Sequence, residues 1–166
     1  MTAEKFATGG QARSGVLVDT NLLVLLIVGS VNANRIATFK RTRKYSRSDY
    51  ELLLDVIHPF QPLYTVAHVM AEVSNLTDLN GPERIRARDV QRQMLTILTE
   101  PEMASARAAG NLNYQALGLV DAAIASVAQE YQCAVLTDDL DLYLALQREG
   151  IDAYNFTHVQ AQAWGL

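Results

Sequence analysis

Acidic residues recur where the pattern of the sequence changes from one element of secondary structure to the next. They follow the apolar runs "VLV" and "AVLT", open the segment "DAAIASVAQEY", and interrupt the apolar segment "VAHVMAEVSNL". Each one alone has a simple structural explanation, because an acid at the start of a helix caps it or interacts with its dipole. Together they are candidates for one site. These residues are Asp19, Glu72, Asp121, Asp138, Asp139 and Asp141.

A set of carboxylates in one pocket indicates metal chemistry. Hard oxygen ligands suit Mg²⁺ or Mn²⁺, which bind carboxylates together with water and substrate phosphate. Such a site can bind one or two ions, activate a water and stabilise the leaving oxygen of a phosphodiester. The other catalytic patterns are missing from the sequence. His58, His68 and His158 lack ligand spacing, and neither a Ser-His-Asp or Cys-His set nor a glycine-rich phosphate loop is present.

Four short apolar segments must position these acids. They read as strands, namely Val16 to Asp19, "PLYT", "AVLTDD" and "IDAYNF", and helical segments separate them. Strands that alternate with helices predict an α/β fold with a mostly parallel sheet and helices on both faces. In open parallel sheets function gathers at the carboxyl ends of the strands, where Asp19 and Asp139 lie.

The helix boundaries follow from caps and stops. The helix "NLLVLLIVGS" is predicted to end at Gly29, Ser48 to cap "DYELLLDVI", and Thr65 to cap "VAHVMAEVSNLTDL". A long charged helix is expected from Glu83 to Thr99, and a short Ala-rich one after Pro101. Later helices are "VDAAIASVAQEYQ" and "LDLYLALQREG". Residues 1–14 read as a loose tail and residues 15–166 as a single three-layer domain.

Length, composition and cysteine content favour a small cytoplasmic protein. A chain of 166 residues with 49% hydrophobic residues fits one domain with a sizeable core. The lone Cys133 reads as a buried residue in a reducing compartment. The apolar run from Val16 to Gly29 contains Asp19 and is too short to cross a bilayer, which needs about 20 residues. The sequence therefore predicts no membrane association.

The charge is unevenly distributed. The net charge of -4 argues against nucleic acid, but six of the 14 basic residues lie between Arg35 and Arg47. Phe39 and Tyr45 are interleaved with them, so the segment could be an arm that tracks phosphates and stacks bases. A solvated loop whose aromatic side chains dock on the core is the alternative. The candidate RNA-binding residues are Lys40, Arg41, Arg43 and Lys44.

The ordered set of motifs resembles the PIN domain family, which includes the VapC toxins of bacterial toxin–antitoxin pairs. The resemblance extends from Val16 to Phe156. It rests on "VLVDTN", on Glu72 in "MAEVSNL", on Asp121 in "GLVDAAIASVA" and on "VLTDDLD". Two features depart from the toxin pattern. Val120 stands where Thr or Ser usually precedes the late Asp, and the basic insert "IATFKRTRKYSRSDYELL" is additional.

The resemblance implies a role for each matching residue. The metal-binding and catalytic carboxylates would be Asp19, Glu72, Asp121 and Asp139, with Asp141 as an accessory metal ligand. Thr20, Asn21 and Thr137 would orient these acids through hydrogen bonds. Asp138 falls at a position that the family leaves variable.

The function implied is a metal-dependent endoribonuclease that hydrolyses RNA with Mg²⁺ or Mn²⁺, as a toxin or in another role. A toxin would have an antitoxin protein as partner, and homodimers are common among similar proteins. The alternative is a non-catalytic RNA-binding or assembly module on the same fold. A phosphoaspartyl phosphatase also begins with a strand and Asp, but it needs a second Asp where Asn21 stands.

Overall fold

The structure is a computed structural model that describes residues 15–165. Its centre is a parallel sheet with the strand order β2-β1-β3-β4. The strands are β1 (Val16–Val18), β2 (Leu63–Tyr64), β3 (Ala134–Thr137) and β4 (Ala153–Asn155). Val16 is in register with Leu63 on one side and with Ala134 on the other. The predicted α/β class, the four strand positions and the parallel sheet are confirmed.

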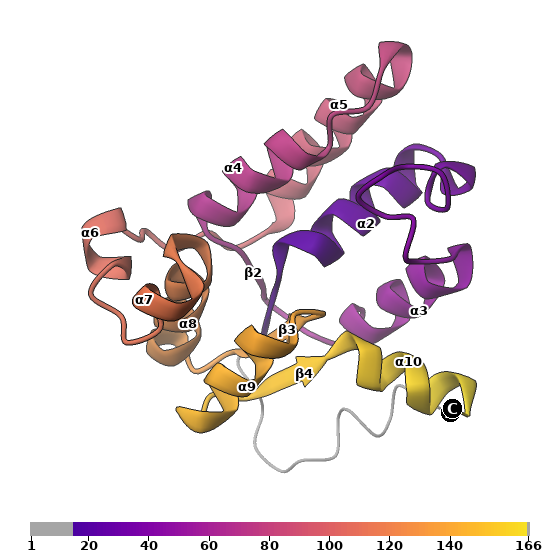
Figure 1. Cartoon of the computed structure of the whole chain (residues 1–166). Coiled ribbons are helices and arrows are strands. Elements are labelled where there is room, and N and C mark those ends of the chain that lie inside the picture. Colours follow the sequence, from indigo (N-terminus) through magenta and orange to yellow (C-terminus); the bar gives the residue numbers. More distant parts are fainter. Residues whose placement is uncertain (1–14, 166) are drawn as a thin grey trace.

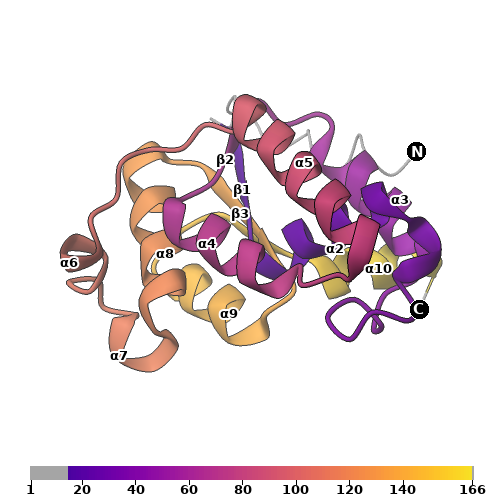
Figure 2. The same ribbon diagram turned by 90° about the horizontal axis from the view of Figure 1, so that it is seen from above.

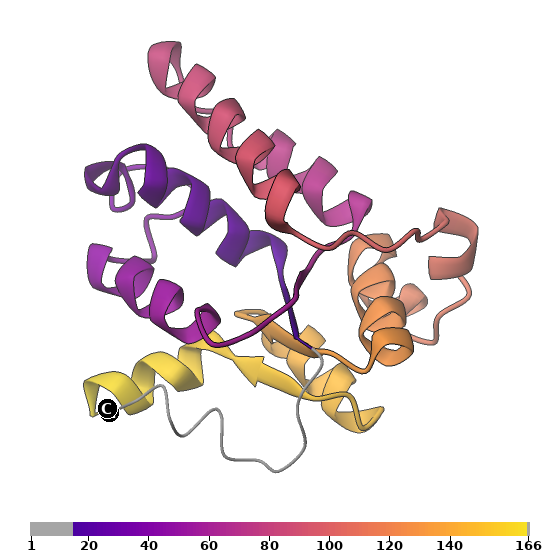
Figure 3. The same cartoon turned by 180° about the vertical axis from the view of Figure 1, so that it is seen from behind.

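Helices cover both sides of this sheet, as a three-layer domain requires. Figures 1 and 3 show α6, α7 and α8 to one side of the strands and α2, α3 and α10 to the other. Figure 2 shows α4 and α5 from above, running along α2, on which both pack. The helices are α2 (Thr20–Val31), the 3-10 turn η1 (Ala33–Arg35), α3 (Arg47–Ile57), α4 (Ala67–Leu76), α5 (Gly81–Ile97), α6 (Ser105–Ala108), α7 (Tyr114–Leu117), α8 (Leu119–Tyr131), α9 (Leu140–Arg148) and α10 (Phe156–Trp164).

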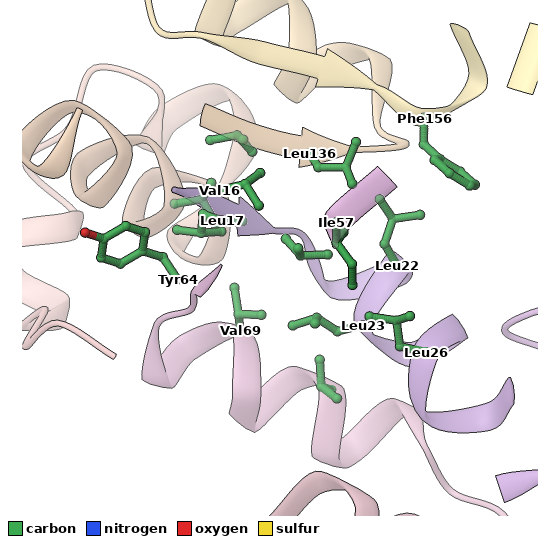
Figure 4. Packing of buried hydrophobic residues seen from close by; sticks show 14 of the residues in the cluster. Val16, Leu17, Leu22, Leu23, Leu26, Ile57, Tyr64, Val69, Leu136 and Phe156 are labelled. Atoms are coloured by element: carbon green, nitrogen blue, oxygen red, sulfur yellow. The ribbon is translucent and has the colours of Figure 1, made fainter. Parts of the chain in front are cut away.

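The core surrounds β1 and α2. All of β1 and the α2 residues from Leu22 to Gly29 are buried. Figure 4 shows Leu22 and Leu136 near Phe156, with Val16 and Leu17 on the adjacent strand β1 in the same buried cluster. Burying one such side chain stabilises a fold by about 1.5–3 kcal/mol. A helix that is apolar on all sides must be enclosed by the rest of the protein, so packing fixes the position of α2. It therefore also fixes Asp19, the acid that directly precedes this helix.

Gly29 does not end its helix, contrary to the prediction. The helix α2 continues to Val31 and is followed by Asn32 as C-cap. The lack of a side chain at this position serves packing, because a Cβ atom there would lie 2.4 Å from the ring of Tyr50. The glycine lets α3 approach α2 closely.

Two predicted caps were also wrong. Ser46, not Ser48, caps α3, and it forms a reciprocal capping box with Asp49. The helix α4 begins after Val66 without a side-chain cap, and the buried hydroxyl of Thr65 has no hydrogen-bond partner among the described residues. The helices α7 and α10 were not predicted. The predicted tail, residues 1–14, lies outside the described residues. None of the described helices is both long and apolar enough to cross a membrane.

Candidate metal centre

Four of the acids singled out in the sequence line one hollow of about 280 Å³. The hollow lies where β1 and β3 end and α2 and α9 begin, and α4 and α8 complete its wall. It has an acidic part and an apolar part, and none of the residues from 15–165 that line it is basic. The lining residues are Asp19, Thr20, Asn21, Glu72, Leu76, Leu117, Leu119, Val120, Asp121 and Asp139.

Asp19 is the most enclosed of these acids, with a relative exposure of 5%. It caps α2, and its Oδ1 atom accepts a hydrogen bond from the Thr20 backbone N–H at 2.6 Å. Its Oδ2 atom accepts one from the Thr137 hydroxyl at 2.6 Å. Burial raises the pKa of Asp19 to about 6 even though these hydrogen bonds oppose the rise, and the charges of Asp138 and Asp139 contribute.

Glu72 reaches the hollow from the middle of α4. Its Oε2 atom accepts a hydrogen bond from the Thr20 hydroxyl at 2.8 Å. Thr20 therefore donates its backbone N–H to Asp19 and its hydroxyl to Glu72, and it holds two carboxylates that lie 53 positions apart in the sequence.

Asp139 enters from the start of α9, which it caps. Its Oδ1 atom accepts hydrogen bonds from the backbone N–H groups of Asp141 at 2.8 Å and Leu142 at 3.1 Å. Its own N–H donates to the Thr137 hydroxyl at 2.9 Å. Because that hydroxyl donates to Asp19, Thr137 connects the ends of β1 and β3 at the floor of the hollow.

Asp121 stands in the first turn of α8 and is the least supported of the four. None of the described residues donates a hydrogen bond to its carboxylate or forms an ion pair with it. Burial raises its pKa to about 7, and the charges of Asp19, Asp139 and Glu72 add to the rise. The four acids are thus close enough for their charges to act on one another.

The donor set fits a divalent cation. It offers carboxylate oxygens, the ligands that Mg²⁺ and Mn²⁺ prefer, and no basic lining residue balances their charge. Among residues 15–165, however, no three His, Cys, Asp or Glu side chains are grouped closely enough to hold a metal ion as they stand. Three of the four carboxylates accept hydrogen bonds from protein donors. Metal binding would require the four carboxylates to move closer together.

Other predicted residues lie elsewhere. Asp141 is exposed and does not line the hollow, and a metal role for it stays a prediction. Asn21 does line the hollow, but its amide donates to Asp138 rather than to a lining acid. The partners of Asp138 could not be foreseen, because Lys44 and Tyr45 lie 94 and 93 positions away from it in the sequence.

The basic segment is folded onto the domain. Phe39 and Tyr45 are 7% and 5% exposed, so the expectation of base-stacking aromatics is wrong and they dock on the core. Lys40 pairs with Asp78 at 3.1 Å, and Lys44 pairs with Asp138. The exposed side chains of Arg41 and Arg43 form no hydrogen bond or ion pair within residues 15–165.

Comparison with known families agrees with this geometry. The family model for the PIN domain matches residues 16–145, a range that includes all four lining acids. The chain belongs to the PIN domain family. No curated protein matches the chain. PIN domains are generally nucleases and typically use divalent metals, so this PIN domain has a nuclease-type fold with nucleic acid as the expected class of substrate.

Proposed function

We propose that this PIN domain is a metal-dependent endoribonuclease of the cytoplasm that hydrolyses RNA phosphodiester bonds with Mg²⁺ or Mn²⁺. The observation that carries the proposal is the hollow with four carboxylates and no basic residue in its lining. An inert module would gain nothing from this arrangement, because the charges of the acids raise one another's pKa values and oppose folding. A cation bound there removes that cost.

Asp19, Glu72, Asp121 and Asp139 would hold the ion. A bound divalent ion supplies Lewis acidity, lowers the pKa of a water and offsets charge on the phosphate. Thr20 and Thr137 hold the Asp19 and Glu72 carboxylates at the lining of the hollow through the hydrogen bonds described above. Leu117, Leu119 and Val120 form an apolar wall on one side of the hollow.

Arg41 and Arg43 are the best candidates for contacts with the RNA backbone. Both are exposed, and neither is committed to an ion pair within the described part of the chain. Lys40 and Lys44 were predicted to share this role, but each would have to leave a carboxylate partner to do so.

The direct experiment is cleavage of single-stranded RNA by the purified protein with Mg²⁺ or Mn²⁺, and with EDTA. Cleavage should need the metal and should be lost in Asp139→Asn. A matched control is Asp89→Asn, since Asp89 is an acid on α5 that pairs with Arg92 outside the hollow. Cleavage that persists in EDTA would contradict the mechanism. RNA binding without cleavage of any substrate would favour the non-catalytic module.

The biological role that we propose is that of a toxin, which the resemblance to VapC proteins supports. An antitoxin protein would then be its partner, and a homodimer is the expected state. Induced expression should arrest growth, whereas expression of Asp139→Asn at the same level should not. Normal growth with active enzyme would favour a housekeeping or antiviral nuclease. A small reading frame directly upstream of the gene would identify the candidate antitoxin.

A further inference from the structure

Asp138 is the acid of the "DDLD" group that the proposed metal site does not use. Its side chain is only 4% exposed. Its Oδ1 atom accepts a hydrogen bond from the Asn21 amide at 3.1 Å. Its Oδ2 atom accepts hydrogen bonds from the Lys44 ammonium and the Tyr45 hydroxyl. One buried carboxylate thus joins three donors.

These donors come from two segments that are distant in the sequence. Asn21 lies in the first turn of α2, two residues after Asp19. Lys44 and Tyr45 end the basic segment that precedes α3. The ring of Tyr45 packs edge-on against Phe156 at a centroid distance of 6.4 Å, and the Lys44 ammonium lies 5.1 Å from the centroid of the Tyr45 ring. The end of the basic segment is therefore fixed to the core.

Both strand ends that carry metal-site acids are held through Asp138. Asp138 itself is the residue before Asp139, and its partner Asn21 is adjacent to Thr20, which binds Asp19 and Glu72. On the floor of the hollow the same two strand ends are joined by Thr137 and by the hydrogen bond from the Asp19 N–H to the Leu136 carbonyl at 2.9 Å. The separation of Asp19 and Asp139 is thus set by two independent connections.

The charges agree with a structural role for this group. Burial raises the pKa of Asp138, but hydrogen bonds from Lys44 and Tyr45 outweigh it and bring the pKa below its usual range. The ammonium of Lys44 offsets the negative charge of Asp138 beside the acidic hollow.

We propose that Asp138, Lys44 and Tyr45 form a positioning group that fixes the strand ends bearing Asp19 and Asp139, so that the basic segment supports the metal site. This inference rests on the proposed function. It assigns Lys44 to the support of the site rather than to RNA, in contrast to the expectation from the sequence. Removal of one donor should loosen the site without changing contacts with the substrate.

The test uses variants that remove one contact each. Tyr45→Phe keeps the ring against Phe156 and removes the hydroxyl. Lys44→Met keeps an apolar stem and removes the ammonium. Lys40→Met is the matched control, because its partner Asp78 is exposed and does not line the hollow. Melting curves verify that each variant is folded, and Tyr45→Phe is the variant least expected to disturb folding.

Four sets of measurements are made on each full-length variant. They are Mn²⁺ affinity by calorimetry, RNA affinity in EDTA across salt concentrations, amide hydrogen exchange of Asp19 and Asp139 without metal, and KM and kcat for RNA cleavage at limiting Mn²⁺. Tyr45→Phe and Lys44→Met should weaken Mn²⁺ binding about 10-fold, as is typical when a group behind a metal ligand is removed. Exchange at Asp139 should become faster, KM for RNA should stay unchanged, and kcat at limiting Mn²⁺ should fall. Lys40→Met should leave Mn²⁺ affinity and exchange unchanged.

Two results would overturn the inference. One is unchanged Mn²⁺ affinity and exchange in both Tyr45→Phe and Lys44→Met. The other is a weaker, less salt-dependent RNA affinity in Lys44→Met with Mn²⁺ affinity intact, which would make Lys44 an RNA contact. A wild-type protein that binds no Mn²⁺ would instead refute the proposed function. The exchange measurement, made without metal, still shows whether the strand ends loosen.

Discussion

Replacing Asp121 by Asn tests the acidic hollow most directly, because Asp121 carries the least compensated charge. The rise of its pKa from 3.8 to about 7 corresponds to a cost of about 4 kcal/mol for ionisation in the folded state. Part of the side chain faces the open hollow, and halving this figure for solvent screening leaves about 2 kcal/mol. The variant also loses the favourable interaction of an acid with the start of α8, which reduces this gain by about 0.5 kcal/mol.

The net gain at pH 8 without metal is therefore about 1.5 kcal/mol, which should raise the melting midpoint by about 3–6 °C for a domain of this size. The sign depends on pH. A carboxyl group whose pKa is raised on folding destabilises the folded state increasingly as pH rises from the unfolded value of about 3.9 to the folded value. At pH 5 the cost is about one third of its value at pH 8, so Asp121→Asn should change the midpoint little there.

Melting curves of wild type and variant at both pH values, with and without Mn²⁺, measure these effects. Mn²⁺ at about 100 times its dissociation constant should stabilise the wild type by roughly 2.7 kcal/mol, or about 5–10 °C, and Asp121→Asn by less. Glu83→Gln is the matched control, since Glu83 occupies the first turn of α5 but does not line the hollow. It should lower the midpoint slightly at both pH values. If Asp121→Asn behaves like this control and keeps the full Mn²⁺ shift, Asp121 is an ordinary acid at a helix start and the proposed site must be redrawn.

Three further changes have expected outcomes. Asp139→Asn should abolish cleavage while its amide oxygen still caps α9, and circular dichroism should show an intact fold; retained activity would remove Asp139 from the ligand set. The double change Arg41→Gln and Arg43→Gln should weaken RNA binding and reduce the slope of log affinity against log salt by about 1.4, or about 0.7 per lost phosphate contact; an unchanged slope would place the RNA elsewhere. Gly29→Ala should lower the melting midpoint by a few degrees, because its Cβ atom would lie 2.4 Å from the ring of Tyr50. This overpacking outweighs the better helix propensity of alanine. A higher midpoint would mean that the ring moves aside freely.

The positions of the strands could be predicted from the sequence, whereas several helix ends could not. A buried parallel strand shows as a short apolar run ended by a polar residue, and "VLVD" and "AVLTDD" are of this kind. Helix starts are ambiguous when two caps are adjacent. Ser46 and Ser48 each have an acid three residues on, Asp49 and Glu51, so both satisfy the capping-box spacing. The structure uses Ser46, which directly follows the anchored Tyr45.

The candidate site, too, could be predicted from the sequence only in part. The acids at the ends of β1 and β3 could be placed together by topology alone, because parallel strands bring their carboxyl ends to one edge. The direction in which each side chain points could not be predicted from the sequence, because it depends on partners from distant segments. Asp138 and Asp139 are chemically identical neighbours, yet one faces Lys44 and Tyr45 and the other lines the hollow. The family resemblance assigned Asp139 to the hollow, but the partners of Asp138 appear only in the packed structure.

The cap that Asp139 provides for α9 has a consequence for ion selectivity. Its Oδ1 atom already accepts two N–H groups, so a single oxygen, Oδ2, is free to coordinate an ion. In Asp19 each oxygen accepts one hydrogen bond, which also disfavours bidentate coordination. Ca²⁺ takes six to eight oxygens and accepts bidentate carboxylates, whereas the smaller Mg²⁺ needs an octahedron and retains several waters. The hollow should therefore discriminate against Ca²⁺, and a competition titration in which Ca²⁺ displaced Mn²⁺ as readily as Mg²⁺ does would contradict this. In a cell, such monodentate coordination would keep calcium from occupying the site that we propose for magnesium.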